Sequence, residues 1–591
     1  MAERGRALIL YALLAVLCTW PVLPTMGDRL PGDGGDAYHG IWAIWWLAET
    51  VAGRADLFDC RSIFYPFGVS LANDSLSLAN GILSLPLQWL FGLAPAYSML
   101  FLLSFALGGW SLYLLARALS LGHRPALLAG VIFAYAPYHV AHAFGHLDLM
   151  PVQWVGFFFL ALLQVLRGAR GLWPVWAGVF FTLAALSAWY YLLYLMLAAL
   201  VAWLLYLLTH RARLADGRWW RGCLLAALTA LLLLAPVVGP VITVWQRQGF
   251  TATPDAEWYS VRYSADLAAL LTPPRWHLLL GTRVQPLYAR AFLANEVERT
   301  VYLKALVLLL AGYGLVRATG RWRWWAAGGA LTALLLALGP LPLWLGRPLL
   351  AVRLPYHYLL QLPLFAHQQS ASRAIVLTYL GLALLAAAGA DALAVRLRAA
   401  RSTRVRAAGN LFLLGAGVAL LLDYVCLPYP SSPGRVPALY RELARDGQVL
   451  LELPGAARSR WLYFQTVHRR PLINGYISRI PDASRQAQRD EPLFRFLFDD
   501  ELQRLIGAGK IQSVRAFGHI PLPRDLAVLR AYHVSHVLLH PDADPGQYHA
   551  LRAALLKIFG QLGVLRDGIE VYAVPPPALR TITADTNPVS R

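Results

Sequence analysis

Long apolar runs recur along most of this sequence, and they constrain its fold more than any other feature. A helix needs about 17 to 25 apolar residues to cross the hydrocarbon core of a bilayer. Eleven runs qualify, at residues 7–26, 97–118, 125–142, 151–167, 173–189, 190–209, 222–244, 301–317, 324–345, 373–395 and 408–427. The chain is 58% hydrophobic and only 14% charged, which a soluble protein would not tolerate on its surface. We therefore predict a polytopic α-helical membrane protein with about 11 transmembrane helices; residues 76–93 are either a twelfth span or a re-entrant segment.

The formal net charge of +20 is explained by the expected membrane topology and does not indicate a nucleic-acid-binding surface. Basic residues gather in short clusters between alternate apolar runs, as the positive-inside rule predicts for cytoplasmic loops. These clusters are Arg117 with Arg124, Arg167 with Arg170, Arg211–Arg221, Arg317–Arg323 and Arg396–Arg406. We interpret residues 7–26 as a retained first helix, because no small-residue cleavage site precedes Gly27. The N-terminus is then cytoplasmic, the expected location is a bacterial inner membrane, and no nucleic-acid partner is expected.

The same topology divides the chain into two expected domains. Residues 1–427 form the membrane domain, with outer loops at 27–96, 246–300 and 346–372, and an odd number of spans places residues 428–591 outside. In that tail, the patterns predict strands at 448–453, 534–539 and 569–574 and helices at 437–446 and 545–559, which indicates an extracytoplasmic α/β domain. Gly509-Lys510 lacks the glycine and hydroxyl residue of a phosphate loop, so nucleotide binding is not supported.

Cysteine offers no disulfide framework and no thiolate metal site. Cys18, Cys223 and Cys426 fall inside apolar runs, and only Cys60 lies in a polar loop.

The first outer loop carries the strongest candidate for chemistry, the two carboxylates of Asp33 and Asp36. The glycines at positions 34 and 35 permit a tight turn that would let both carboxylates face one small volume. There, either repulsion raises the pKa of one carboxyl group or a divalent cation such as Mg²⁺ or Mn²⁺ bridges the pair. The alternative is a solvated turn in which Asp36 is the N-cap of the next helix. We favour a functional pair, since a cap needs one aspartate.

The segment after this loop has Tyr38, Trp42 and Trp45 at helical spacing. This pattern predicts an amphipathic helix in the headgroup region, which would anchor the loop and flank a lipid-linked substrate.

Three histidines, His139, His142 and His146, recur at helical spacing at the outer end of the third run, and Asp148 follows. Three imidazoles and a carboxylate suit a metal, but histidines also collect at membrane interfaces. We favour interfacial or substrate contacts over a metal.

The other outer loops contain acidic and basic candidates, including Asp266, Glu296, Arg353 and His357. Outside arginines either contact lipid headgroups or neutralise a phosphate. Arg373 is singled out because it opens a membrane helix, where a cation is costly unless it is paired.

Several short motifs resemble a known group of proteins. Gly32-Asp33-Gly34-Gly35-Asp36, Phe64-Tyr65-Pro66-Phe67-Gly68, Gly145-His146-Leu147, Gln153-Trp154 and Ser372-Arg373 are similar to those of largely uncharacterised bacterial membrane proteins. Together with the architecture, they resemble the GT-C superfamily of polyprenyl-phosphate-dependent membrane glycosyltransferases. The resemblance implies that Asp33 or Asp36 is a base or metal ligand. The chain departs from the best-known pattern, because it has Asp-x-x-Asp in place of Asp-x-Asp or Asp-Glu.

Two functions follow as expectations. The first is a glycosyltransferase, a hexosyl or pentosyl transferase, that moves a sugar from a polyprenyl-phosphate donor to an envelope glycan, lipid or protein. Asp33 and Asp36 are then the catalytic candidates, and any metal would bind to them. The candidate substrate-binding residues are His39, Tyr65, Asp74, His142, His146, Asp148, Asp266, Glu296, Arg353, His357 and Arg373. The alternative is a non-catalytic protein, either a lipid-intermediate transporter or a scaffold for the tail domain.

Overall fold

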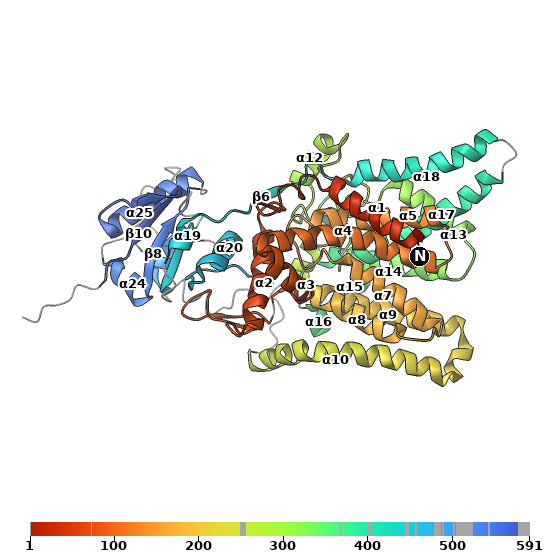
Figure 1. The fold of residues 1–591 in the computed structure, drawn as a ribbon, viewed down its shortest axis with the longest axis horizontal. Coiled ribbons are helices and arrows are strands. Elements are labelled where there is room, and N and C mark those ends of the chain that lie inside the picture. Colours follow the sequence, from red (N-terminus) through yellow and green to blue (C-terminus); the bar gives the residue numbers. More distant parts are fainter. Residues whose placement is uncertain are drawn as a thin grey trace, which may run out of the picture. The chain divides into compact units, whose positions relative to one another are not determined.

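The chain forms two compact units in a computed structural model. The first contains Met1–Arg54 and Ala72–Arg435, and the second contains Ala55–Leu71 and Val436–Arg591 (Figure 1). The structure describes residues 2–72, 74–248, 256–366, 368–399, 403–443, 448–455, 458–477, 486, 490–499, 503, 524–541 and 544–576. The sequence alone suggested a division after residue 427 and did not separate residues 55–71 from the first loop.

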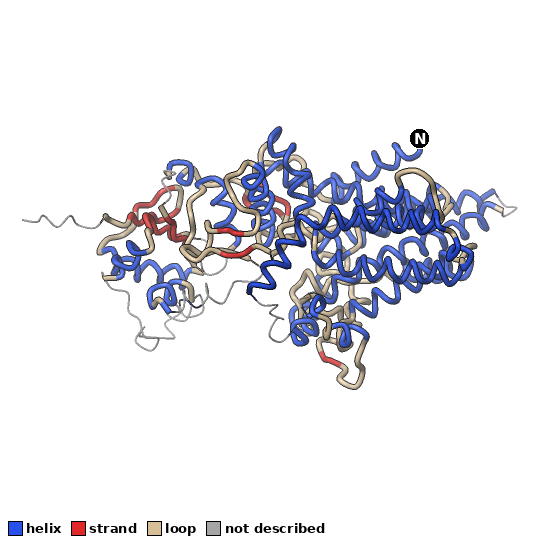
Figure 2. Tube along the Cα trace, turned by 90° about the horizontal axis from the view of Figure 1, so that it is seen from below, coloured by secondary structure: helices blue, strands red, loops and turns tan. Residues whose placement is uncertain are grey.

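Helices make up most of the first unit (Figure 2). The long ones are α1 (Ala2–Cys18), α2 (Asp36–Val51), α3 (Leu78–Phe91), α4 (Leu93–Ala118), α5 (His123–Ala134), α7 (Val152–Leu166), α8 (Trp173–Ser187), α9 (Trp189–Thr209), α10 (Gly217–Gln248), α13 (Ala305–Arg317), α14 (Trp322–Ala337), α17 (Ile375–Arg398) and α18 (Thr403–Tyr424). The shorter ones are α6 (Pro137–His142), α11 (Ala256–Arg262), α12 (Gly281–Arg290), α15 (Pro355–Leu359), α16 (Pro363–Ala366) and the 3₁₀ turns η1 (Arg211–Ala215) and η2 (Ala371–Ala374). Each of the eleven predicted segments contains a helix.

Four of these helices are long and apolar enough to cross a membrane. Within the described residues, they are Leu93–Ala118, Trp189–Thr209, Gly217–Gln246 and Ala371–Leu397. Six shorter apolar helices accompany them, at Leu78–Phe91, His123–Ala134, Val152–Leu166, Trp173–Ser187, Ala305–Arg317 and Leu411–Tyr424. The chain is therefore a multi-pass membrane protein; the number of about 11 spans stays a prediction.

Helices α13 and α17 pack closely because small residues face one another. A Cβ added at Gly314 would lie 2.0 Å from the Leu385 carbonyl oxygen, and one added at Gly389 would lie 2.0 Å from that of Leu310. Glycine therefore lets the two backbones approach, as at many interfaces between membrane helices.

The predicted span 125–142 is two helices rather than one. Helix α5 ends at Ala134, and α6 begins at Pro137. Proline lacks the amide hydrogen that a continuous helix needs, and it disfavours the helical conformation at Ala136, where ψ is 140°. The break makes α6, which carries His139 and His142, a separate short segment.

Helix α2 is buried and does not lie on a surface, contrary to our prediction of an interfacial helix. Tyr38, Trp42, Trp45 and Trp46 are all under 9% exposed. Helices α3 and α4 pack against α2, so its aromatic side chains belong to the core of the unit.

Strand β1 (Arg29–Pro31), which precedes α2, pairs antiparallel with β6 (Ser431–Pro433). Two further antiparallel pairs are short, β2 (Asp59–Cys60) with β3 (Val69–Ser70) and β4 (Leu343–Trp344) with β5 (Arg347–Pro348).

The second unit contains a four-stranded sheet in the order β7-β8-β10-β9. Strands β7 (Val449–Leu453) and β8 (Val534–Leu539) are parallel, while β10 (Ile569–Ala573) pairs antiparallel with β8 and with β9 (Val564–Arg566). The helices are α19 (Leu439–Glu442), α20 (Ser459–His468), α22 (Pro492–Leu497), α24 (Asp525–Ala531) and α25 (Pro545–Phe559). The predicted strands and the helix at 545–559 are present; part of the predicted helix 437–446 and Gly509-Lys510 lie outside the described residues.

Candidate functional site

The loop between β1 and α2 adopts a conformation that its glycines permit. Gly32 has φ +116°, and a Cβ there would lie 2.2 Å from the carbonyl oxygen of Phe144. Gly34 has φ +86°, again in a region that L residues rarely adopt. The amide of Asp33 donates a hydrogen bond of 2.9 Å to the same Phe144 oxygen. The loop is thereby fixed against the turn that follows α6.

The two aspartates of this loop have different partners. Asp33 is exposed, and its Oδ1 accepts a 3.0 Å hydrogen bond from the amide of Gly35. Asp36 is the first residue of α2, whose N-cap is Gly35 without any side-chain cap. Its Oδ2 lies 2.9 Å from Nε2 of His146, and its side chain is 38% exposed. Asp36 is therefore not the N-cap that the alternative interpretation required.

Two imidazoles continue from Asp36 into the unit. Nδ1 of His146 lies 2.7 Å from Nδ1 of His142, so one ring donates a hydrogen bond to the other. Nε2 of His142 lies 4.0 Å from Oε2 of Glu298, and both of these side chains are 1% exposed. A continuous row of polar groups thus runs inward from the first loop.

The row ends at a buried pair between Glu298 and Arg373. Arg373 donates from Nε and Nη2 to Oε1 of Glu298, at 2.8 and 2.6 Å, and Ser372 donates from Oγ to Oε2 at 2.7 Å. The guanidinium carbon lies 4.3 Å from the ring centroid of Tyr190. Nη1 of Arg373 makes no hydrogen bond within the described residues, although the side chain is only 14% exposed. The guanidinium can therefore accept a further anionic ligand.

A second histidine–aspartate pair lies in the same unit near the first. Nε2 of His39 lies 2.7 Å from Oδ2 of Asp74, and both side chains are buried. Burial alone would lower the pKa of His39, but Asp74 and the charges of Asp36 and Asp148 raise it above its usual value. The imidazole of His39 is thus favoured in its charged form.

Asp148 is a buried carboxyl group beside these pairs. It is 9% exposed, and the turn that carries it is clamped by hydrogen bonds from Tyr191 to the Leu149 carbonyl at 2.5 Å and from Asn80 to the Leu147 carbonyl at 2.8 Å. Burial raises the pKa of Asp148, although His146 and Arg373 oppose that shift. Asp148 therefore keeps its proton to a higher pH than an exposed aspartate does.

The charges of the row stabilise one another. Burial alone would raise the pKa of Glu298, but Arg373, His142 and His146 together lower it to about 2. Burial would likewise lower the pKa of His146, but its hydrogen bond to Asp36 and the charge of that carboxylate raise it. Glu298 is thus a carboxylate at neutral pH, and His146 is favoured as an imidazolium.

In this structure the histidine and carboxylate groups of the row are hydrogen-bonded to one another or to Ser372 and Arg373. His142, His146 and Glu298 place ligand atoms within 4.8 Å of one another, but both oxygens of Glu298 already bind Ser372 and Arg373. A tetrahedral ion would hold two histidine nitrogens about 3.3 Å apart, whereas the Nδ1 atoms of His142 and His146 lie 2.7 Å apart as hydrogen-bond partners. Asp36, a predicted ligand with Asp33, is neutralised by His146. We assign no step to a metal.

Other predicted site residues make their contacts elsewhere in the first unit. Asp266 accepts hydrogen bonds from the amides of Ala268, Leu345 and Gly346, which makes it part of a turn. Glu296 pairs with Arg275 at 2.7 Å. Arg353 hydrogen-bonds to His357, which in turn contacts Glu257.

Tyr65 belongs to the second unit, where its ring lies edge-on to His533 with the centroids 6.5 Å apart. Its proposed substrate contact therefore stays a prediction.

Three residues in contact with Arg373 were not among the candidates predicted from the sequence: Glu298, Ser372 and Tyr190. The sequence did contain one signal for them: Arg373 opens a membrane helix and therefore needs a partner of opposite charge. A buried arginine requires a carboxylate, and the second outer loop offers Glu296 and Glu298.

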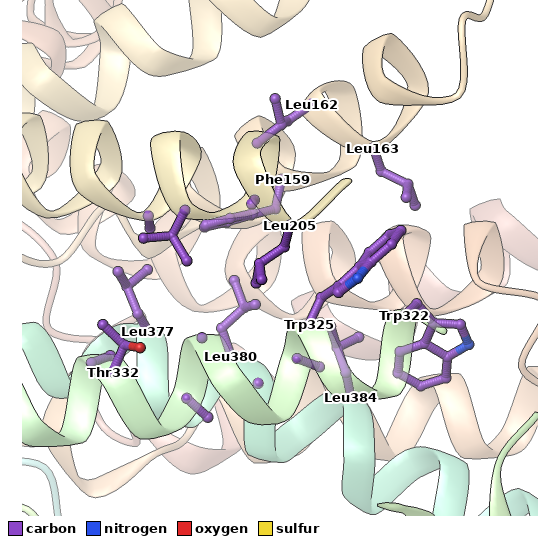
Figure 3. Close-up of a pocket in the computed structure, with 18 of the residues that line it drawn as sticks. Phe159, Leu162, Leu163, Leu205, Trp322, Trp325, Thr332, Leu377, Leu380 and Leu384 are labelled. Atoms are coloured by element: carbon purple, nitrogen blue, oxygen red, sulfur yellow. The ribbon is translucent and has the colours of Figure 1, made fainter. Parts of the chain in front are cut away.

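An apolar cavity of about 150 Å³ lies between α4, α7, α9, α14 and α17. Figure 3 shows Leu377 and Thr332 toward one end and Trp322 toward the other, with Phe159, Leu205 and Trp325 between them. Leu377 follows Arg373 by four residues, or about 6 Å along a helix. The cavity therefore begins about one helical turn along the backbone from Arg373.

No family model matches the sequence, and no curated protein is similar enough to match it. Among solved structures, the arabinofuranosyltransferase AftD from Mycobacteria matches with a TM-score of 0.60 and 17% identity, over 97% of this chain and 40% of that chain. ArnT from Cupriavidus metallidurans matches with a TM-score of 0.48 and 13% identity, over 97% of this chain and 99% of that chain. The oligosaccharyltransferase AglB from Archaeoglobus fulgidus matches with a TM-score of 0.46 and 13% identity, over 94% and 71%.

The likeness to AftD shows the fold. The chain has the GT-C fold, as the sequence resemblance implied, and it spans 40% of the length of the AftD chain.

Proposed function

We propose that this chain is a membrane glycosyltransferase that moves a sugar from a polyprenyl-phosphate donor to an envelope acceptor on the extracytoplasmic side. One observation carries the proposal: a single row of contacts joins a partly exposed carboxylate, Asp36, to a buried guanidinium, Arg373, that has a donor available for an anion. Glycosyl transfer from a phosphate needs a base at one side of the sugar and a cation at the other.

The reaction assigns one role to each end of the row. The acceptor hydroxyl gives its proton to the carboxylate of Asp36 while its oxygen forms a bond to the anomeric carbon. The bond from that carbon to the phosphate oxygen breaks, and its electron pair stays with the departing lipid phosphate. Arg373 stabilises the charge that develops on this phosphate, through Nη1. Attack opposite to the leaving group inverts the anomeric configuration.

The cavity next to Arg373 supports a lipid-linked donor. Its lining is almost wholly apolar; η2 contributes Arg373, and α17, which follows it directly, contributes the cavity residues Leu377, Leu380 and Leu384. A lipid phosphate bound at Arg373 could thus place its hydrocarbon chain between the helices, where apolar surface is favourable. Because the AftD structure is described as an arabinofuranosyltransferase, pentosyl donors come first in the test and hexosyl donors second.

The alternative is a non-catalytic lipid-intermediate transporter or a scaffold for the tail. A transporter is expected to have ionisable residues near the bilayer midplane on interrupted helices. Here Arg373 lies in the turn that leads into α17, and His146 and Glu298 lie in connections between helices. This placement favours the transferase.

The test is transfer of radiolabelled sugar from polyprenyl-phosphate pentose and hexose donors to envelope acceptors, by purified protein in lipid. Wild type is compared with Asp33→Asn, Asp36→Asn and Arg373→Gln. We expect label transfer by wild type and its loss in Asp36→Asn and Arg373→Gln. Because the side chain of Asp33 is exposed and accepts a hydrogen bond from its own turn, Asp33→Asn is expected to retain more activity than Asp36→Asn. Absence of transfer from every donor by folded wild-type protein would support the alternative.

We further propose an inner-membrane location with the N-terminus in the cytoplasm and the C-terminal unit outside. A reporter that is active only outside the cytoplasm, fused after residue 443, should be active; the same reporter fused within Arg211–Arg221 should not.

A further inference from the structure

The two histidines between Asp36 and Arg373 have no role in the reaction described above. His146 uses both ring nitrogens, Nε2 toward Asp36 at 2.9 Å and Nδ1 toward His142 at 2.7 Å. The hydrogen bond at one ring nitrogen of a histidine decides whether the other nitrogen carries a proton, so the two contacts of His146 are coupled.

The contacts define one consistent arrangement of protons. As an imidazolium, His146 donates from Nε2 to Asp36 and from Nδ1 to His142. Nδ1 of His142 must then accept, so a neutral His142 carries its hydrogen on Nε2, which faces Glu298 at 4.0 Å. In this arrangement every group meets a neighbour of opposite polarity, from the carboxylate of Asp36 to the Glu298–Arg373 pair.

We propose that His146 is a positioning residue that holds the base Asp36, and that His142 fixes the orientation of His146. This inference rests on the proposed transferase function. The charge-assisted hydrogen bond keeps one oxygen of Asp36 in place and keeps the group ionised, despite the neighbouring carboxyl groups of Asp33 and Asp148. The imidazolium also adds a positive charge beside the path of an anionic donor.

The ionisable groups around His146 come from several elements. Asp36 lies on α2, His142 on α6, Asp148 in the following turn and Arg373 in η2. Asp36 and Asp148 favour the imidazolium, whereas Arg373 opposes it. The raised pKa of His146 agrees with the geometry, in which the direct contact with Asp36 is strongest.

The sign of the pH effect follows from this raised pKa. His146 is charged below its pKa in the folded protein and loses its proton as the pH rises through that value. The site then loses a positive charge while Asp36 stays negative. Binding of the anionic donor weakens, and so does the hydrogen bond that positions Asp36. Wild-type kcat/KM should therefore fall on the alkaline side.

The experiment compares the pH dependence of kcat/KM, from about pH 6 to about pH 9, for wild type, His146→Gln, His142→Gln and His277→Gln. His277 provides a matched control, because its Nε2 contacts an aspartate, Asp423, at 2.7 Å in the same unit, and Asp423 is not a member of this row. We expect His146→Gln to lower kcat at least about tenfold and to remove the alkaline decline, with a smaller effect from His142→Gln. The His277→Gln variant should keep the wild-type profile.

The outcomes separate this inference from the proposed function. If Asp36→Asn abolishes transfer but His146→Gln keeps the wild-type kcat and alkaline decline, the transferase stands and the positioning role is wrong. If wild type transfers no sugar, the proposed function itself fails. Should His146→Gln not fold, His142→Gln decides the question, since it removes the partner of Nδ1 of His146 and leaves the contact between His146 and Asp36 in place; an unchanged profile there would reject the role.

Discussion

The buried Glu298–Arg373 pair should carry a large share of local stability. Removing one partner leaves the other charge buried without compensation, which typically costs about 3 to 5 kcal/mol. We expect Glu298→Gln to lower the thermal unfolding temperature clearly, measured in lipid nanodiscs. Asp28→Asn removes a carboxylate from an exposed pair with Arg435 and should leave that temperature almost unchanged. Equal shifts for both variants would contradict the assignment.

The same pair should also make the protein sensitive to acid in a defined range. Its interactions lower the pKa of Glu298 from 4.5 to about 2. The corresponding stabilisation is present above pH 4.5 and is lost as the pH falls toward about 2, a total of about 3 kcal/mol. The stability difference between wild type and Glu298→Gln should therefore shrink across this range in chemical unfolding experiments. A constant difference would show that Glu298 does not change protonation there.

At the residue scale, the sequence indicated the need for a partner but not the partner. Arg373 was recognisable because a membrane helix tolerates a cation only when it is paired. Glu296 and Glu298 lie in the same outer loop, and the sequence does not distinguish which of them pairs with Arg373. The fold of that loop decides: Glu296 pairs with Arg275, and Glu298 pairs with Arg373. The pairing of Asp36 with His146 across 110 residues was likewise beyond local patterns.

The loop that leads into α2 should tolerate no side chain at Gly32. A Cβ there would meet the Phe144 carbonyl, and the positive φ is strained for any L residue. We expect Gly32→Ala to destabilise the protein by more than about 1 kcal/mol and to reduce activity, because the loop positions Asp36. Gly312→Ala on α13 serves as the control, since a Cβ there meets nothing within 4 Å. A Gly32→Ala variant with wild-type stability and activity would mean that the loop adapts.

At the element scale, composition and periodicity predicted where the helices lie in the sequence, but not where they end or what they pack against. The apolar run 125–142 suggested one span, although Pro137 already gave the local reason for a break. The aromatic spacing of α2 suggested an interfacial helix, yet α3 covers it, and a helix that is apolar nearly all round is typical of a core position. Which element covers which face depends on tertiary contacts that no single segment encodes.

At the scale of the whole chain, the recurring apolar segments were sufficient to predict a multi-pass helical membrane protein. Strand β9 was missed because three exposed residues carry no alternating pattern. The assignment of residues 55–71 to the second unit was also missed. Backbone hydrogen bonds of Phe64 and Tyr65 with Asn474 and Leu472 create that association, and such pairing over about 400 residues has no local signature.

The cavity offers a prediction that links the helical bundle to the site. If Arg373 binds the donor phosphate and the lipid chain lies beside Leu380 on α17, a larger side chain in the cavity should select against long chains. Leu380→Trp should therefore raise KM for a long polyprenyl-phosphate donor much more than for a geranyl-phosphate donor with the same sugar, while kcat with the short donor stays near that of wild type. Transfer assays with the two donors give this ratio directly.

Leu309→Trp controls for the substitution itself, because Leu309 is 73% exposed and lies on α13 outside the cavity. This variant should treat the two donors as wild type does. An equal loss with both donors in Leu380→Trp would indicate a disturbed site rather than a blocked cavity, and unchanged kinetics with the long donor would place the lipid chain elsewhere. The polar groups that bind the phosphate and the sugar are identical in both assays. Only a dependence of KM on the length of the lipid chain would therefore show that the donor lipid occupies the cavity.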